Sequence, residues 1–174
     1  PFCPSHNPKL PNFKVMAYPN DFPAMDLNAS DVPIQYPNIK NAVGAKAPAL
    51  GHCEVILYSP QHDKQLYQLS DAHVTEIVEL WAERFRTLAK DERIKYIFEF
   101  ENRGEEVGVT IHHPHGQLYA YSFVPQKITT ELDNCKKYFR STGKNLFAEL
   151  NRTEKKYKKR VLVETHGFIA YIPY

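Results

Sequence analysis

Prolines are distributed very unevenly along this chain of 174 residues, and their distribution limits where helices can form. Nine of the 13 prolines lie within residues 1–50. Because proline lacks a backbone N–H and disfavours the helical conformation in the residue before it, long helices are not expected there. We therefore expect residues 1–50 to form a lead-in that packs on the surface of the rest of the protein and contains short strands, such as residues 13–17.

Length and composition favour a single domain over residues 1–174. The chain is 43% apolar, which suffices for one sizeable core, whereas two full domains would have little room. No apolar run approaches the roughly 18 residues that a membrane span requires. The formal net charge is only +2, and three cysteines do not make a disulfide scaffold. We expect a soluble cytoplasmic protein with no membrane partner and no nucleic-acid partner.

The clearest periodic pattern predicts an amphipathic helix. Apolar residues recur at spacings of three and four over residues 74–88, and Ser70 is a suitable N-cap. Runs of β-branched and aromatic residues predict strands. Strands are expected at residues 53–59, 94–101, 109–111 and 118–124, shorter helices at 129–139 and 145–158, and a strand pair at 161–174 that turns at His166-Gly167. The predicted fold class is α+β, with a mainly antiparallel sheet flanked by helices.

Histidines concentrate in residues 111–117, where three of the eight lie within four positions. In an extended backbone, His113 and His115 project to the same face. Pro114 fixes φ between them, and Gly116 permits close approach of a ligand. A nucleophilic imidazole needs one free ring nitrogen and a partner that fixes its tautomer, which a backbone carbonyl of this turn can be. Such a ring can accept a phosphoryl group and release it again. Spacing alone fits a metal-binding or merely polar loop equally well.

Several motifs follow one another in the order typical of one family. They are Pro1-Phe2-Cys3, Asn20-Asp21-Phe22, Ser59-Pro60-Gln61-His62, residues 98–104 with Gly108, His113-Pro114-His115-Gly116-Gln117, residues 122–125, Val163-Glu164-Thr165 and Pro173-Tyr174. In this order they resemble the galactose-1-phosphate uridylyltransferases, the transferase branch of the histidine-triad superfamily. Members of that family consist of two related halves. The resemblance therefore covers the first, nucleophile-bearing half, and the second half is expected to be absent from this chain.

The resemblance implies that His115 is the nucleophile, because it is the second histidine of His-Pro-His. His115 would attack the α-phosphorus of UDP-glucose, glucose 1-phosphate would leave, and galactose 1-phosphate would then take the uridylyl group. Gln117 would hold the phosphoryl oxygens, since a neutral amide donates hydrogen bonds without acting as an acid or a base. Two alternatives stay open: a related nucleotidyl phosphorylase or transferase acting on another nucleotide sugar or dinucleotide, and an inactive zinc-stabilised nucleotide-binding fragment.

Further substrate contacts follow from the same resemblance. The implied substrate-binding residues are Asn20, Asp21, Asn102, Gly108, Val109, Thr110 and Gln117. Asn20 and Asp21 would contact the uridine end, whereas Asn102 and residues 108–110 would line the phosphates, which suit backbone donors and a hydroxyl. Without the resemblance, Asn20-Asp21 reads as an ordinary turn and Asn102 as part of an ordinary loop.

A structural zinc site is also implied by the resemblance. Cys3, His62 and His113 match three ligands, a set that suits Zn²⁺, and a cysteine immediately before Pro1 would be the fourth. Without the resemblance, Cys3 is a stray thiol and His62 a surface histidine. Glu131 matches a ligand of a second divalent metal, although a carboxylate in the first turn of a helix explains it equally well. A homodimer is expected from the resemblance alone.

The remaining cysteines and histidines match no chemical position of the family. Cys53 and Cys135 lie in apolar stretches and are expected to be buried thiols. Among the other histidines, a surface or core position is expected for His52, His73, His112 and His166.

Overall fold

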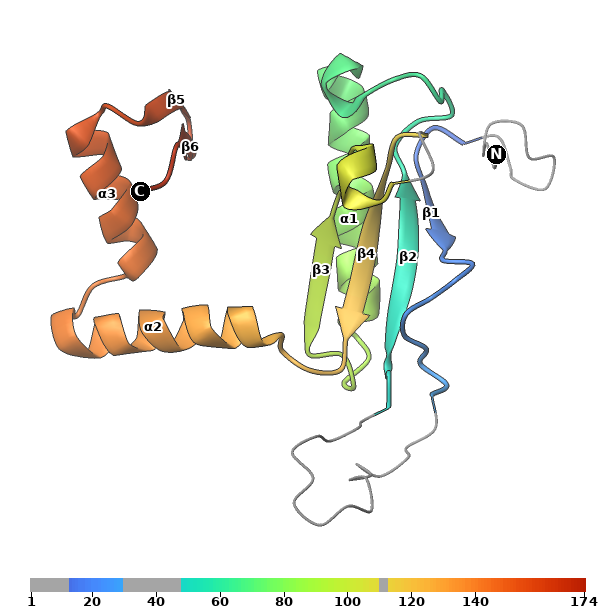
Figure 1. The fold of residues 1–174 in the computed structure, drawn as a ribbon, viewed down its shortest axis with the longest axis horizontal. Helices are drawn as coiled ribbons and strands as arrows, with labels where there is room; N and C mark the ends of the chain where they lie inside the picture. Colours follow the sequence, from blue (N-terminus) through green and yellow to red (C-terminus); the bar gives the residue numbers. More distant parts are fainter. Residues whose placement is uncertain (1–12, 30–47, 110–112) are drawn as a thin grey trace, which may run out of the picture. The chain divides into compact units, whose positions relative to one another are not determined.

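The computed structural model of the chain describes residues 13–29, 48–109 and 113–174 (Figure 1). Cys3, Thr110 and His112 lie outside these ranges. The chain divides into two compact units, residues 1–124 and 125–174. The expectation of one domain over residues 1–174 stays a prediction. Within the described ranges, no helix is both long enough and apolar enough to span a bilayer.

The first unit is built on a four-stranded antiparallel sheet. Its strands are β1 (Met16–Pro19), β2 (Gly51–Leu57), β3 (Tyr96–Phe100) and β4 (His115–Tyr121), in the order β1-β2-β4-β3. Strand β4 pairs with neighbours on both sides, so that Leu57 lies opposite His115 and Phe100 lies opposite Gln117. His115 therefore begins a central strand at the end of the sheet where β2 and β3 finish.

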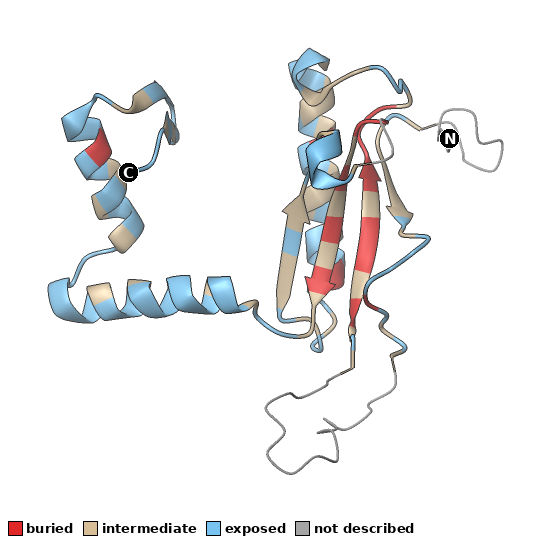
Figure 2. Ribbon diagram, viewed as in Figure 1, coloured by how far each residue is buried: buried red, intermediate tan, exposed pale blue. Residues whose placement is uncertain are grey.

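One helix, α1 (Asp71–Leu88), covers one face of this sheet (Figure 1). The Ser70 hydroxyl caps its first turn by accepting a hydrogen bond from the backbone N–H of His73. Ile77 packs in one buried cluster with residues of β2 and β4, among them Ile56 and Leu118. Along β4, buried residues alternate with partly exposed ones (Figure 2). Strand β4 therefore turns Leu118 and Ala120 toward the helix, and His115 and Gln117 lie on the other face.

Truncation of Ile77 to alanine is expected to destabilise the protein by about 3 kcal/mol, because its buried side chain leaves a cavity against β2 and β4. Ile77 is 0% exposed, whereas its neighbour Val78 is 50% exposed. Val78→Ala is therefore the matched control and should cost about 0.5 kcal/mol or less. Urea unfolding of both variants measures the difference. Equal losses would contradict the assignment of Ile77 to the core.

The second unit contains two helices and a hairpin. They are α2 (Gln126–Thr142), α3 (Leu146–Tyr157), β5 (Val161–Thr165) and β6 (Phe168–Tyr171). Helix α2 ends at Gly143, whose φ of 68° is readily adopted by glycine. The Asn145 side chain caps α3 by accepting a hydrogen bond from the N–H of Ala148. Arg160 donates two hydrogen bonds to the buried Glu154 carboxylate, at 3.0 and 2.6 Å, and so ties α3 to the hairpin.

The structure confirms the predicted α+β class and its antiparallel sheet, with the ends of elements shifted. Val109 lies outside any strand, so this part of the strand predicted at residues 109–111 is wrong, and the rest falls outside the described residues. The reason is Gly108, whose φ of 78° interrupts an extended backbone. Two short 3₁₀ turns, Leu66–Gln68 and Glu105–Val107, were not predicted. Cys53 is buried as expected, whereas Cys135 is only partly buried.

Candidate active site

His115 has its tautomer fixed by the turn that precedes it. Its Nδ1 lies 2.7 Å from the backbone carbonyl oxygen of His113. Because a carbonyl oxygen can only accept a hydrogen bond, Nδ1 must carry the proton and donate it. In the neutral ring Nε2 then keeps a free lone pair. The turn thus supplies the backbone partner that the sequence analysis anticipated, and it leaves one ring nitrogen available for bonding to an electrophile.

His113 is held in a different way and is only 4% exposed. Its Nε2 donates to the backbone carbonyl of Ser59 at 2.7 Å. Its Nδ1 is buried and has no hydrogen-bond partner. Burial is the largest cause that lowers the pKa of His113, and the neighbouring His115 and His62 lower it further. The ring is therefore kept neutral with an unused lone pair, which is the state that a metal ligand needs.

The two histidines line one cavity of about 200 Å³. The cavity is also lined by Gln65, by Pro114 and by residues 101–104, which form the loop after β3. In that loop, Arg103 places its guanidinium 5.5 Å from the centre of the Tyr67 ring. Beside the Glu101 carboxylate, the cavity therefore combines a free imidazole nitrogen with a cation and the Asn102 amide, three groups that suit an anionic ligand.

The other residues singled out from the sequence do not line this cavity. Gln117 lies two positions beyond His115 on the same face of β4. Asn20 and Asp21 form a turn after β1, in which the Asn20 side chain accepts from the N–H of Phe22 at 2.9 Å and Asp21 accepts from the Tyr18 hydroxyl at 3.1 Å. Gly108 is exposed and has a positive φ.

The predicted metal ligands are only partly described. His62 is exposed and close enough to His113 to lower its pKa. Glu131 is exposed on α2, in the second unit. Across the part of the chain that the structure describes, no three side chains of His, Cys, Asp or Glu are grouped so that they could hold a metal ion. Because Cys3 lies outside that part, both metal sites stay predictions.

Residues that sequence reasoning missed also lie at the cavity. Glu101, Arg103 and Gln65 line it, yet none was proposed as a site residue. The available signal was the position of Glu101 and Arg103 on either side of Asn102. Gln65 offered no such signal, because it reaches the cavity only through the folding of the segment between β2 and α1.

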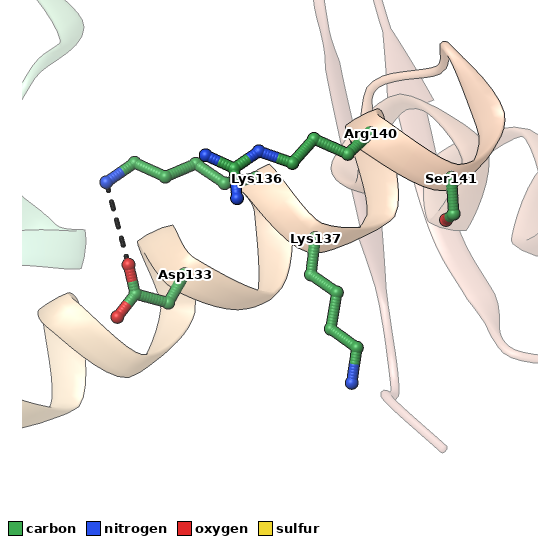
Figure 3. A pocket seen from close by; sticks show the side chains of 5 residues that line it. All are labelled: Asp133, Lys136, Lys137, Arg140 and Ser141. Atoms are coloured by element: carbon green, nitrogen blue, oxygen red, sulfur yellow. Dashed lines mark ion pairs between the residues drawn. The ribbon is translucent and has the colours of Figure 1, made fainter.

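A larger hollow, of about 540 Å³, lies on α2 and has a different character (Figure 3). Lys136 reaches Asp133 in an exposed ion pair of 3.5 Å, whereas Lys137 points to another side of the helix. Arg140 and Ser141 complete its lining. These side chains do not converge, and no imidazole or thiol is among them. The cavity at His115 is therefore the candidate active site.

An antiparallel sheet whose central strand begins with a tautomer-fixed imidazole agrees with the histidine-triad-like fold that the resemblance implies. The model of one family, described as "Galactose-1-phosphate uridyl transferase, N-terminal domain", matches residues 5–125. The chain belongs to this family.

Two of three individual comparisons are with uridylyltransferases, and the other is with a phosphorylase. The chain is 36% identical to the galactose-1-phosphate uridylyltransferase of Thermotoga maritima over 74% of this chain and 40% of that protein. It is 28% identical to the ADP-glucose phosphorylase of Arabidopsis thaliana over 98% of this chain and 46% of that protein. A solved structure titled "Structure of uridylyltransferase" matches with a TM-score of 0.85 and 26% identity, over 99% of this chain and 54% of that one. The chain thus spans about half the length of the relatives it matches.

Proposed function

We propose that this protein is a nucleotidyltransferase of galactose metabolism that exchanges the uridylyl group between UDP-glucose and galactose 1-phosphate. The observation that carries this proposal is the geometry of His115, whose Nδ1–H is bound to the His113 carbonyl and whose Nε2 keeps a free lone pair. Membership of the uridyl transferase family supports the choice of substrates.

The proposed reaction has two steps that use the same nitrogen. In the first step, the lone pair of His115 Nε2 attacks the α-phosphorus of UDP-glucose. A phosphorus–nitrogen bond forms, the bond to the bridging oxygen breaks, and glucose 1-phosphate leaves. The ring becomes positively charged, and the hydrogen bond from Nδ1–H to the His113 carbonyl strengthens with that charge. In the second step, a phosphate oxygen of galactose 1-phosphate attacks the phosphorus, and the nitrogen leaves with its lone pair restored.

The remaining contacts are proposed on the family resemblance. Asn102 and Arg103 would bind the phosphates within the cavity, and Gln117 would hold the phosphoryl oxygens of the intermediate. The uridine end would be bound by Asn20 and Asp21. The loop that lines the phosphates would comprise Gly108, Val109 and Thr110.

A structural zinc ion is proposed at Cys3, His62 and His113. The unpartnered, buried Nδ1 of His113 supports this, since its Nε2 already donates to a backbone carbonyl, as is usual for a metal-bound histidine. When bound, the ion would tie the lead-in to the start of β4 and would take no part in the transfer. A second divalent metal at Glu131 is proposed on the resemblance alone.

Metal analysis of purified protein tests the zinc proposal. We expect about one zinc per chain. The His113→Ala variant should lose most of this zinc, because the substitution removes one of the proposed ligands. His166→Ala is the matched control, because His166 is exposed in the β5–β6 turn. Elemental analysis by mass spectrometry gives the ratio. Equal zinc content in all three proteins would exclude His113 as a ligand.

The ADP-glucose phosphorylase relative supports a second candidate function, in which the same nucleophile takes another nucleotide. Incubation with UDP-glucose or ADP-glucose, followed by intact-mass measurement, separates the two. We expect a uridylyl adduct with UDP-glucose. An adduct formed only with ADP-glucose would favour the alternative. Nucleotide binding without any adduct would indicate the inactive zinc-stabilised fragment instead.

The proposal also covers the oligomeric state of the protein and its location in the cell. A homodimer is proposed on the family resemblance alone. A cytoplasmic location is proposed because Cys53 and Cys135 are free thiols, which fits a reducing compartment. The net charge of +2 supports neither a nucleic-acid nor a membrane partner.

A further inference from the structure

Tyr58 contacts the residues on both sides of His115. It directly follows β2 and is 1% exposed. Its backbone N–H donates to the carbonyl of Pro114 at 3.2 Å. Its side chain lies against Gly116, so closely that a Cβ added at that position would fall 3.0 Å from the ring Cζ and nearer still to the hydroxyl oxygen. Neither neighbour of the nucleophile can therefore move far without displacing Tyr58.

Two residues of helix α1 also contact Tyr58. The Nε2 of His73 donates to the backbone carbonyl of Tyr58 at 2.7 Å. The Trp81 ring meets the Tyr58 ring edge-on, with 6.1 Å between the ring centres. His73, which matched no chemical position in the sequence, thus anchors the segment that supports His115. The helix and the nucleophile are connected through this one tyrosine.

We propose that Tyr58 is a positioning residue: its ring and its backbone N–H fix the chain on both sides of His115. This inference rests on the proposed function, because it assigns Tyr58 to the same nucleophile and the same phosphate cavity. Tyr58 itself contacts no substrate in this scheme. Phenylalanine at this position would keep the ring against Gly116, whereas leucine would remove it.

The experiment that tests this positioning action needs no substrate and therefore separates this inference from the proposed function. The Nδ1–H proton of His115 is followed by ¹⁵N-edited NMR of the full chain. We expect it to be protected from exchange in the original protein and in Tyr58→Phe, and to lose protection in Tyr58→Leu, which removes the ring from Gly116. Thermal unfolding checks that the leucine variant folds. Retained protection in a folded Tyr58→Leu protein would overturn the positioning action, whereas an original protein that gives no adduct but shows this pattern would refute only the proposed function.

Discussion

Replacing His115 by alanine is expected to abolish the uridylyl adduct and to lower the rate of transfer by a factor of about 10⁴ or more, because no other group replaces the lost nucleophile. Affinity for UDP-glucose should change much less. The groups proposed to bind phosphate, Asn102 and Arg103, lie on the loop after β3 and do not depend on the imidazole. Intact-mass measurement reports the adduct, and titration calorimetry reports the affinity.

The control for this variant is His166→Ala, which removes an exposed imidazole from the second unit. It should form the adduct at the original rate. An undiminished adduct in His115→Ala would remove His115 from the mechanism. Loss of both adduct and binding, with the fold intact, would show that the ring serves to bind substrate rather than to carry the uridylyl group.

Replacing Glu54 by alanine is expected to cost about 3 kcal/mol of the free energy of unfolding, the largest loss that we expect from a single polar side chain here. Glu54 is 5% exposed and accepts two hydrogen bonds from Arg84, at 2.9 and 2.6 Å. His52 lies 3.0 Å away on the same carboxylate. Because this ion pair joins β2 to α1, its removal leaves the partly buried guanidinium of Arg84 with only the exposed Glu83 carboxylate, 3.6 Å away, as a counter-charge. Urea unfolding measures the loss.

The matched control is Glu76→Ala, on the same helix as Arg84. Glu76 pairs with Lys14 across an exposed surface, where water and salt screen the interaction. Its loss should therefore be about 1 kcal/mol or less. If the two variants lose the same free energy, the buried pair does not hold α1 to the sheet as described.

Periodicity located the elements of the fold better than their ends. Helix α1 was predicted because a period of three and four residues is a property of the helix itself. Strand β4 was expected to begin at residue 118, but it begins at His115. His115 and Gly116 are not typical strand-forming residues, and their extended conformation comes from pairing with Leu57 and Ile56 of β2. Such pairing joins segments that the sequence does not show to be neighbours.

The candidate site was predictable where it is continuous in the chain. His113 and His115 were found from one short motif, and Asn102 from the family resemblance. Tyr58 and Gln65 were not, because each acts through a contact with a segment far away in the sequence. The contact of Tyr58 with Gly116 depends on the antiparallel pairing of β2 with β4. It also depends on the packing of the Tyr58 ring against Trp81 of α1. No spacing rule along the chain expresses that arrangement.

The most direct test of the account is to locate the adduct within the chain. The protein is incubated with UDP-glucose without an acceptor, digested under conditions that preserve a phosphorus–nitrogen bond, and sequenced by tandem mass spectrometry. We predict that the uridylyl group is found on His115. A uridylyl group on His113, His62 or any other residue, or UDP-glucose turnover with no covalent adduct, would contradict the account.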